Sequence, residues 1–323
     1  MKRQIRWVAA AVIVLSLIWL FRPLPPVQPT PPGSIPPDES MFPIHPEAET
    51  LELSHGHKTD EAFVLLHGIT NTPVQFREFA EILFQRGSNV VVPRMPFHGH
   101  EDRLTEAKSG FTAQIMLDEA NRAVDRARLL GRRVKVMGLS VNGVTAAWIS
   151  QNRADVDTVV IMAPFFAVKG MPDWTIAPVA RLFARLPNFF VWWDFRQREN
   201  LGQNSLAYPR FSTRAMAGVM HFGLDVFREA ESAPPEARRI VVVTSAIDQA
   251  VSNGRIGELV ALWRRSAPGR VETYEFPADK NVPHDWMYPG QPDQQVETVY
   301  PILLNLLDHP AEPAVSAPAG IAR

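Results

Sequence analysis

The sequence predicts an α/β fold, in which a mostly parallel sheet of about six to eight strands is flanked by helices and interrupted by a helical cap insertion. Short apolar runs alternate with longer amphipathic stretches between Ala48 and His309, which is typical of parallel strands joined by helices. Most of these runs are short and rich in β-branched side chains, which favours strands over buried helices. Because 46% of the 323 residues are hydrophobic, this body can bury a large core.

Six runs are predicted as strands, and two of the stretches between them as helices. The strands are Ala62–Leu66, Asn89–Val92, Val134–Met137, Val156–Met162, Arg239–Thr244 and Val271–Phe276. The first helix is expected to follow Thr72 as its N-cap, with Gln75 completing a capping box, and to end at Gly87. Apolar residues at helical spacing predict the second helix from about Thr112 to Leu130.

One interval, residues 165–237, breaks the alternation. It contains no clean strand, yet it carries nine of the 18 Phe and three of the eight Trp. We interpret it as a helical cap whose inner face lines a substrate pocket, and a helical subdomain that packs its own core is the alternative. The candidate pocket residues are Trp174, Phe189, Phe190, Trp192 and Trp193.

The two ends of the chain differ from this body. Basic residues precede an apolar run from Trp7 to Phe21, the pattern of an export signal, and no small-residue cleavage pattern follows it. We therefore predict an uncleaved signal anchor over residues 1–22, with a cleaved signal or a buried helix as alternatives. Ten of the 29 prolines lie in residues 23–47, which predicts a proline-rich linker that spaces the body from the bilayer. Residues 310–323 are expected to form a disordered tail.

The basic residues before the apolar run predict which side of the membrane the body occupies. Flanking positive charge stays in the cytoplasm, so the body is expected on the far side. In a bacterium this means an inner-membrane protein with one N-terminal span and a periplasmic body, or a secreted or periplasmic protein if the signal is cleaved.

The composition excludes two kinds of function. The 33 basic and 34 acidic residues leave no excess of positive charge that would indicate binding of nucleic acid. The chain has no Cys, which excludes thiolate nucleophiles and Cys-ligated zinc.

A candidate nucleophile follows the third predicted strand. Val134–Met137 leads directly into Gly138-Leu139-Ser140-Val141-Asn142-Gly143 and then into a helical pattern. A serine on such a strand-to-helix turn projects its hydroxyl from the edge of the sheet, beside a helix N-terminus that favours a developing anion. A turn that only caps a helix is the alternative.

Two further groups follow later strands. Asp248 comes after the fifth strand and His284 after the sixth, so all three groups lie at carboxyl ends of strands, where open α/β sheets place their sites. The order Ser140, Asp248, His284 is the one that a nucleophile-elbow sheet requires. Asp279 and Asp285 compete with Asp248 as the acid, although Asp285 adjoins His284 in sequence, where two side chains seldom align for a hydrogen bond.

These motifs resemble those of the α/β-hydrolases, and most closely bacterial carboxylesterases and monoacylglycerol lipases. The resemblance is carried by Leu65-Leu66-His67-Gly68, Pro93 to Gly99, Gly138-Leu139-Ser140, Ser245-Ala246-Ile247-Asp248 and Pro283-His284-Asp285. It implies Ser140 as nucleophile, His284 as general base and acid, and Asp248 as the group that orients His284. It also implies the N–H groups of Ile69 and Val141 as the oxyanion hole.

The expected function is cleavage of carboxylic esters, on small-molecule or lipid substrates, by a Ser-Asp-His triad that needs no metal or organic cofactor. Asn142 departs from the family motif G-x-S-x-G, which leaves an inactive binding protein as one alternative. A peptidase of the same fold, with Asp173 or Asp194 receiving a substrate amine, is another. His98, His100, Glu101 and Asp102 form a cluster that could ligate a metal, although their spacing fits no helical pair of ligands. The sequence predicts no oligomeric state.

Overall fold

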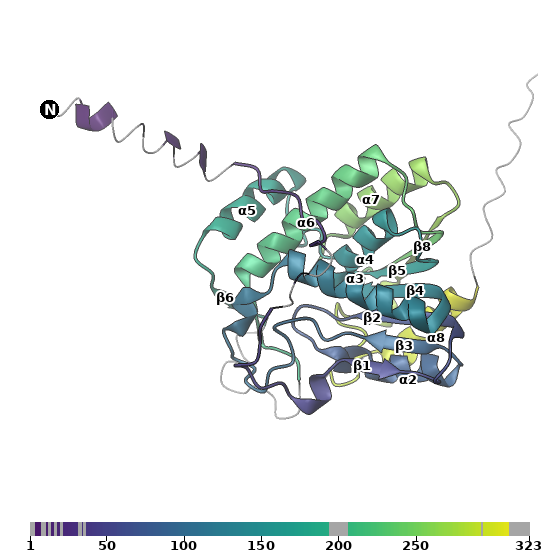
Figure 1. The fold of residues 1–323 in the computed structure, drawn as a ribbon. Coiled ribbons are helices and arrows are strands. Elements are labelled where there is room, and N and C mark those ends of the chain that lie inside the picture. The colour runs from purple at the N-terminus through teal and green to yellow at the C-terminus, as the bar shows by residue number, and fades with distance from the viewer. Residues whose placement is uncertain are drawn as a thin grey trace, which may run out of the picture.

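The computed structural model describes residues 4–7, 11, 14–15, 18–19, 22–31, 34, 37–193, 206–291 and 293–309. Within them, a seven-stranded sheet of order β1-β3-β2-β4-β5-β8-β9 carries helices on both faces (Figure 1). The strands are β1 (Leu51–Leu53), β2 (Thr59–Leu66), β3 (Asn89–Val92), β4 (Gly131–Leu139), β5 (Thr158–Met162), β8 (Arg239–Ser245) and β9 (Val271–Phe276). The predicted fold class is thereby confirmed.

All six predicted strands are present, with shifts of a few residues at their ends. Five neighbouring pairs are parallel, and only β1 runs antiparallel, beside β3. The sequence prediction missed β1 because it is three residues long and lies at the edge of the sheet, where one strand face carries little apolar surface.

The helices form one layer on each face of the sheet. They are α2 (Arg77–Gln85), α3 (Ala113–Leu130), α4 (Val141–Asn152), α5 (Asp173–Arg185), α6 (Thr213–Ser232), α7 (Asn253–Ser266) and α8 (Val296–Asp308). Helix α4 packs against α3 and α6, and α6 packs against α7. On the other face, α2 meets α8 through the rings of Phe79 and Tyr300, whose centroids are 5.1 Å apart.

The start of the first helix differs from its prediction. Thr72 opens a short 3-10 turn, Pro73–Phe76, without a side-chain cap, and α2 begins only at Arg77. The predicted capping box is wrong because the Gln75 side chain bonds elsewhere, to Gly68 and Asp285. The N-cap of α3 is confirmed, since Thr112 Oγ1 accepts from the N–H of Ile115 at 3.2 Å.

The insertion between β5 and β8 contains two helices, α5 and α6, and a small antiparallel ribbon. The ribbon pairs β6 (Phe190–Trp192) with β7 (Arg210–Ser212), so the expectation of an insertion without strands is wrong. Residues 194–205, between its strands, are outside the described residues. Helix α6 is largely buried and packs on α4, so the second half of the insertion belongs to the helical layer of the body.

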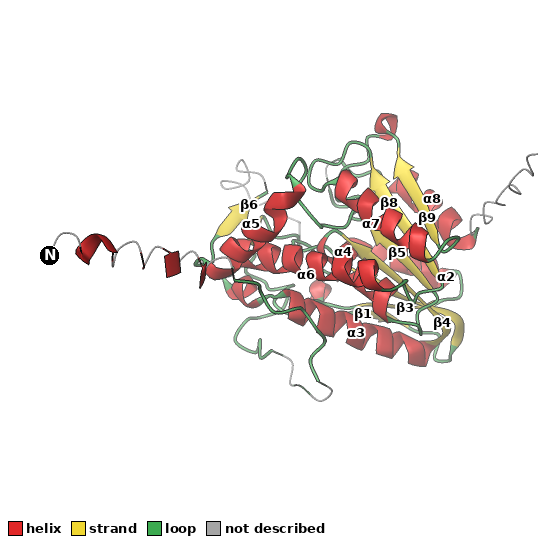
Figure 2. Cartoon of the chain, turned by 90° about the horizontal axis from the view of Figure 1, so that it is seen from above, coloured by secondary structure: helices red, strands yellow, loops and turns green. Residues whose placement is uncertain are grey.

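The proline-rich linker is not the free spacer that its composition predicts. Residues 25–30, which we call the strap, lie across α3 and α6 (Figure 2). Further along, Glu39 accepts hydrogen bonds from Arg94 and from the N–H of Phe97. Prolines hold the strap extended along the body, where the N–H groups of Val27 and Thr30 find partners.

The predicted membrane segment, residues 7–21, is described only at a few positions, and residues 310–323 lie outside the described part of the chain. Among the residues that are described, no helix has both the length and the apolar character needed to cross a bilayer. The anchor and the disordered tail remain predictions.

Candidate active site

Ser140 lies between β4 and α4 in a strained backbone conformation. Its φ is +61° and its ψ is −117°, a region that residues with a side chain adopt rarely and at a cost. Two glycines allow this turn. A Cβ at Gly138 would lie 2.2 Å from the carbonyl oxygen of Asn142, and one at Gly143 would lie 2.8 Å from Cα of Pro164. The turn thus presents the Ser140 hydroxyl at the carboxyl edge of the sheet.

The structure brings the three predicted triad side chains together. His284 Nε2 is 3.0 Å from Ser140 Oγ, and His284 Nδ1 is 2.7 Å from Asp248 Oδ2. Ser140 and Asp248 are buried and His284 is half-buried. These distances allow a proton to pass from the hydroxyl to the imidazole while the carboxylate holds the ring.

The environment of Asp248 keeps its carboxylate ionised. Burial alone raises the pKa of Asp248, but the hydrogen bond and charge of His284 and the N–H groups of Ala250 and Val251 outweigh burial and lower it below its usual value. An ionised Asp248 fixes the proton on His284 Nδ1 and leaves Nε2 as the acceptor that faces Ser140.

Two backbone N–H groups are available on the segments that follow β2 and Ser140. Ile69 lies in the loop after β2, and Val141 is the first residue of α4. Within the described residues, neither N–H group donates a hydrogen bond to the protein. Free N–H groups next to a helix N-terminus are suited to an anion, so this pair matches the oxyanion-hole prediction in position, while its role stays a prediction.

The loop that carries Ile69 is fixed by buried side chains. His67 donates from Nδ1 to the carbonyl of Gly68 at 2.9 Å, and Gln75 Oε1 accepts from the N–H of Gly68 at 2.8 Å. The carbonyl oxygen of Ile69 lies 2.7 Å from His98 Nε2 and accepts from Lys108 Nζ at 2.6 Å. The carbonyl groups of Gly68 and Ile69, on the two sides of the Ile69 N–H, are therefore both hydrogen-bonded, which limits rotation of the peptide that carries this N–H.

Asn142 joins the same network, which gives a physical reason for the departure from the family motif. Its Nδ2 donates to the carbonyl of His67 at 2.6 Å, so the nucleophile helix is tied to the loop of Ile69. The close approach to β5 that requires a glycine occurs one residue later, at Gly143. Asn142 is thus compatible with the turn geometry, and sequence reasoning missed this contact because it joins residues 75 positions apart.

The two rival acids lie in different places. Asp285 accepts hydrogen bonds from Asn71 Nδ2, Gln75 Nε2 and Gln291 Nε2, each at 2.7 Å, so it ties the loop of His284 to the loop after β2. Asp279 is exposed on a short 3-10 turn. Neither carboxylate makes a hydrogen bond to His284 among the contacts of the described residues, and Asp248 does.

The predicted cap residues Trp174, Phe189, Phe190 and Trp193 are exposed or contact other residues of the insertion. Trp174 is 79% exposed on α5, while the ring of Phe189 packs near Phe183 and that of Trp193 near Phe211. Phe190 lies under the guanidinium of Arg210. Trp192 is half-buried in β6. The start of the insertion does reach the site, because the N–H of Phe165 donates to the carbonyl of Ser140 and Lys169 Nζ donates to that of Asp248.

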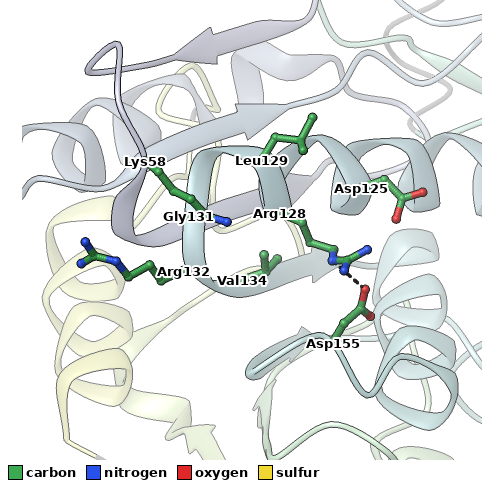
Figure 3. Close-up of a pocket in the computed structure, with 8 residues that line it drawn as sticks. All are labelled: Lys58, Asp125, Arg128, Leu129, Gly131, Arg132, Val134 and Asp155. Carbon is green, nitrogen blue, oxygen red and sulfur yellow. Dashed lines mark ion pairs between the residues drawn. The ribbon is translucent and has the colours of Figure 1, made fainter.

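Two depressions on the described surface include residues at the amino end of β4, remote from this site. One of about 490 Å³ is lined by Lys58, Arg128, Arg132 and their neighbours at the amino end of β4 (Figure 3). Strand β4 has nine residues, so this end is about 30 Å from Ser140 at about 3.3 Å per residue. No group of three or more His, Asp or Glu residues in the described part of the chain could hold a metal ion.

The family comparison adds to this geometry. A family model described as "Serine aminopeptidase, S33" matches residues 57–261, which is more than half of the chain. The chain belongs to this family. The match includes Ser140 and Asp248 and ends before His284. The α/β-hydrolase resemblance read from the sequence is therefore confirmed. A search of curated proteins finds no match for the sequence of this hydrolase.

Solved structures share the fold of this hydrolase at low sequence identity. A structure of metagenome-derived lipolytic enzymes, LipS and LipT, has a TM-score of 0.60 and 18% identity, covering 82% of this chain and 99% of the other. The Paleococcus ferrophilus monoacylglycerol lipase has a TM-score of 0.59 and 15% identity, covering 80% and 97%. A soluble variant of the Saccharomyces cerevisiae monoglyceride lipase has a TM-score of 0.59 and 12% identity, covering 83% and 89%. At these identities the likeness establishes the fold.

The buried loop also predicts how stability depends on pH. The pKa of His67 is lowered from 6.5 to about 4, mainly by burial; the charges of Lys108 and Arg94 also lower it, and the hydrogen bond to Gly68 raises it. Below about pH 6.5 the unfolded chain binds a proton at His67 that the folded chain does not, so folding stability falls as the pH drops toward 4. The full shift corresponds to about 3 kcal/mol.

Urea unfolding of the wild type and of His67→Gln, each at pH 7 and pH 4.5, measures how much of the pH-dependent loss of stability is due to His67. The wild type is expected to lose more stability between the two pH values than the variant does. His57→Gln, at an exposed position, serves as the control and keeps the wild-type difference. Equal losses in the wild type and His67→Gln would contradict the assignment.

Proposed function

We propose that this chain is a serine hydrolase that cleaves carboxylic esters through an acyl-enzyme. The observation that carries the proposal is the contact series from Ser140 Oγ to His284 Nε2, at 3.0 Å, and from His284 Nδ1 to Asp248, at 2.7 Å. It occurs on a strained strand-to-helix turn beside two free N–H groups, which is the arrangement that acyl transfer requires.

In the proposed mechanism, His284 takes the proton of Ser140 as Oγ attacks the ester carbonyl. The N–H groups of Ile69 and Val141 bind the oxyanion of the tetrahedral intermediate. His284 then protonates the leaving alcohol, and the acyl group stays on Ser140. Water, activated by His284, attacks the acyl-enzyme, and the carboxylic acid leaves as Ser140 recovers its proton. Asp248 holds the imidazolium that forms twice in this cycle.

The choice of esters rests on the cap and on the carboxylates beside the site. Residues 165–193 contain long apolar and aromatic stretches, which suit an acyl chain or a lipid. An aminopeptidase, as the family description names, needs a carboxylate free to bind a substrate amine. Asp285 is engaged by three amide groups, Asp173 is exposed at the start of α5, and Asp194 is outside the described residues. The similarity in fold to lipolytic enzymes and monoacylglycerol lipases also supports an ester, and not a peptide, as the substrate.

The N-terminal residues extend the proposal to location. The basic residues and the apolar run from Trp7 to Phe21 support a single span of the bacterial inner membrane, with the hydrolase body in the periplasm. Retention of the protein with the membrane after a high-salt wash, with Trp7 still present in the mature chain, is the expected result. Release as a soluble protein with a new N-terminus near Pro23 would contradict the anchor.

Two assays test the proposed reaction. Wild-type protein is expected to be labelled by a fluorophosphonate, which reacts with an activated serine. It is then expected to hydrolyse nitrophenyl esters, with kcat/KM at least tenfold higher than for aminoacyl anilides of similar size. Hydrolysis of the anilides alone would identify a peptidase. Failure of both the labelling and the hydrolysis would leave the inactive binding protein as the better interpretation.

A further inference from the structure

The strap is bonded to the body along its length. The N–H of Val27 donates to Asp225 Oδ2 at 2.9 Å, and the N–H and hydroxyl of Thr30 donate to the two oxygens of Asp118 at 2.8 and 2.9 Å. His221 Nε2 lies 2.8 Å from the carbonyl oxygen of Pro25. Asp225 is buried, so the strap supplies a donor to a carboxylate that has little access to water.

These contacts fix where the N-terminal segment leaves the body. The carbonyl of Arg22 accepts from Arg185 Nη2, at the last residue of α5. The guanidinium of Arg185 also lies 5.7 Å from the centre of the Trp19 ring. Figures 1 and 2 both place α5 and β6 at the end of the molecule from which the N-terminal segment departs. Trp19 and Arg22, at the end of the predicted membrane segment, therefore contact the last residue of α5 in the cap.

The same end of the molecule exposes large apolar side chains. We call this set the cap face; it comprises Trp174 (79% exposed), Phe189 (47%), Trp193 (44%) and Leu186 (36%). The described parts of this region, residues 165–193 and 206–214, are basic, with five Lys or Arg and one Asp. The acidic residues of the insertion lie mainly after that, on α6 and beyond. Tryptophan with flanking positive charge is typical of a surface that sits at a phospholipid headgroup layer.

We propose that the cap face lies on a lipid bilayer, with the strap fixing the body in that orientation. The occupant is the surface of the membrane that holds residues 7–21, so the inference rests on the proposed function. The base of the cap reaches the site through Phe165, whose N–H bonds the carbonyl of Ser140. A lipid ester that leaves the bilayer under the cap is then delivered beside the nucleophile.

Labels at two positions test the orientation in the full-length protein. The chain has no Cys, so Trp174→Cys and Leu129→Cys each give one site for a nitroxide label. Leu129 is 68% exposed on α3, at the edge of the depression of Figure 3, and serves as the control. In vesicles of neutral and anionic phospholipid, the label at position 174 is expected to be several-fold less accessible to a water-soluble nickel complex than the label at 129. Equal accessibility would overturn the proposal.

The strap can be released without changing the body. Val27→Pro with Thr30→Pro keeps the extended backbone but removes all three donors to Asp225 and Asp118. Gln28→Pro, at an exposed residue that makes no bond to the body among the described contacts, is the matched control. Protection of position 174 is expected to fall in the double variant and to persist in the control. Protection of position 174 in both the double variant and the control would overturn the role of the strap.

Two further readouts separate this proposal from the proposed function. Failure of the wild type to sediment with vesicles would reject the anchor, whatever the labels report. Fluorophosphonate labelling of Ser140 in every variant, with position 174 exposed to water, would reject bilayer docking and leave the hydrolase proposal intact. Protection of position 174 without fluorophosphonate labelling would reject the hydrolase proposal and leave bilayer docking intact.

Discussion

Replacement of Ser140 by alanine is expected to lower kcat for ester hydrolysis by about 10⁴-fold to 10⁶-fold, the range found when a triad nucleophile is removed. The large effect follows because the proposed reaction passes through a covalent bond to Ser140 Oγ, and no other hydroxyl in the described structure contacts His284. The substrate is still expected to bind, so KM changes far less than kcat. Steady-state kinetics and fluorophosphonate labelling measure both consequences.

Ser150→Ala is the matched control for this variant. Ser150 lies on α4, the helix that follows Ser140, and its hydroxyl donates to the carbonyl of Ala146, one turn earlier. It is expected to keep kcat within about twofold of the wild type. If Ser140→Ala retained most of the wild-type rate, the nucleophile would have to be another group and the acyl-enzyme proposal would fail.

Replacement of Asp248 by asparagine is expected to lower kcat by about 10⁴-fold at neutral pH. The amide would occupy the same volume, but its NH₂ group can donate to His284 Nδ1 and stabilise the tautomer whose Nε2 carries the proton. Such an imidazole cannot accept the proton of Ser140. The asparagine oxygen can still accept the hydrogen bonds from the N–H groups of Ala250 and Val251, so the free energy of unfolding is expected to change little.

Asp279→Asn provides the control for Asp248→Asn, since Asp279 is exposed and makes no bond to His284 among the described contacts. Its kcat is expected to equal that of the wild type. A loss larger for Asp279→Asn than for Asp248→Asn would reverse the assignment of the acid. Rate measurements between pH 5 and 10 with the same ester would show whether the remaining activity depends on the neutral imidazole or on hydroxide.

The fold and the candidate triad could be predicted because each depends on short stretches of sequence. Buried parallel strands such as Asn89–Val92 are continuous apolar runs, and Ser140, Asp248 and His284 each follow such a run directly. Parallel strands place their carboxyl ends at one edge, so the order of the motifs is enough to predict that they meet. The distances of 3.0 and 2.7 Å had to come from the structure.

The supporting contacts could not be predicted because they join residues far apart in the chain. Gln75 has the spacing of a capping box, yet its amide is drawn to Gly68 and to Asp285, which is 210 positions away. Proline content predicts an extended backbone for residues 25–30 but not the surface on which it lies. The bonds to Asp118 and Asp225 depend on two helices that the folded body brings together.

The fixed loop around Ile69 has a further consequence for the energetics of the proposed reaction. When negative charge forms on a carbonyl oxygen in water, nearby dipoles must turn toward it, and this reorganisation contributes much of the barrier. Here the peptide dipoles at Gly68 and Ile69 are already oriented by His67, Gln75 and Lys108. The orientation is achieved during folding, so little reorganisation is left for the moment at which the ester carbonyl becomes an oxyanion.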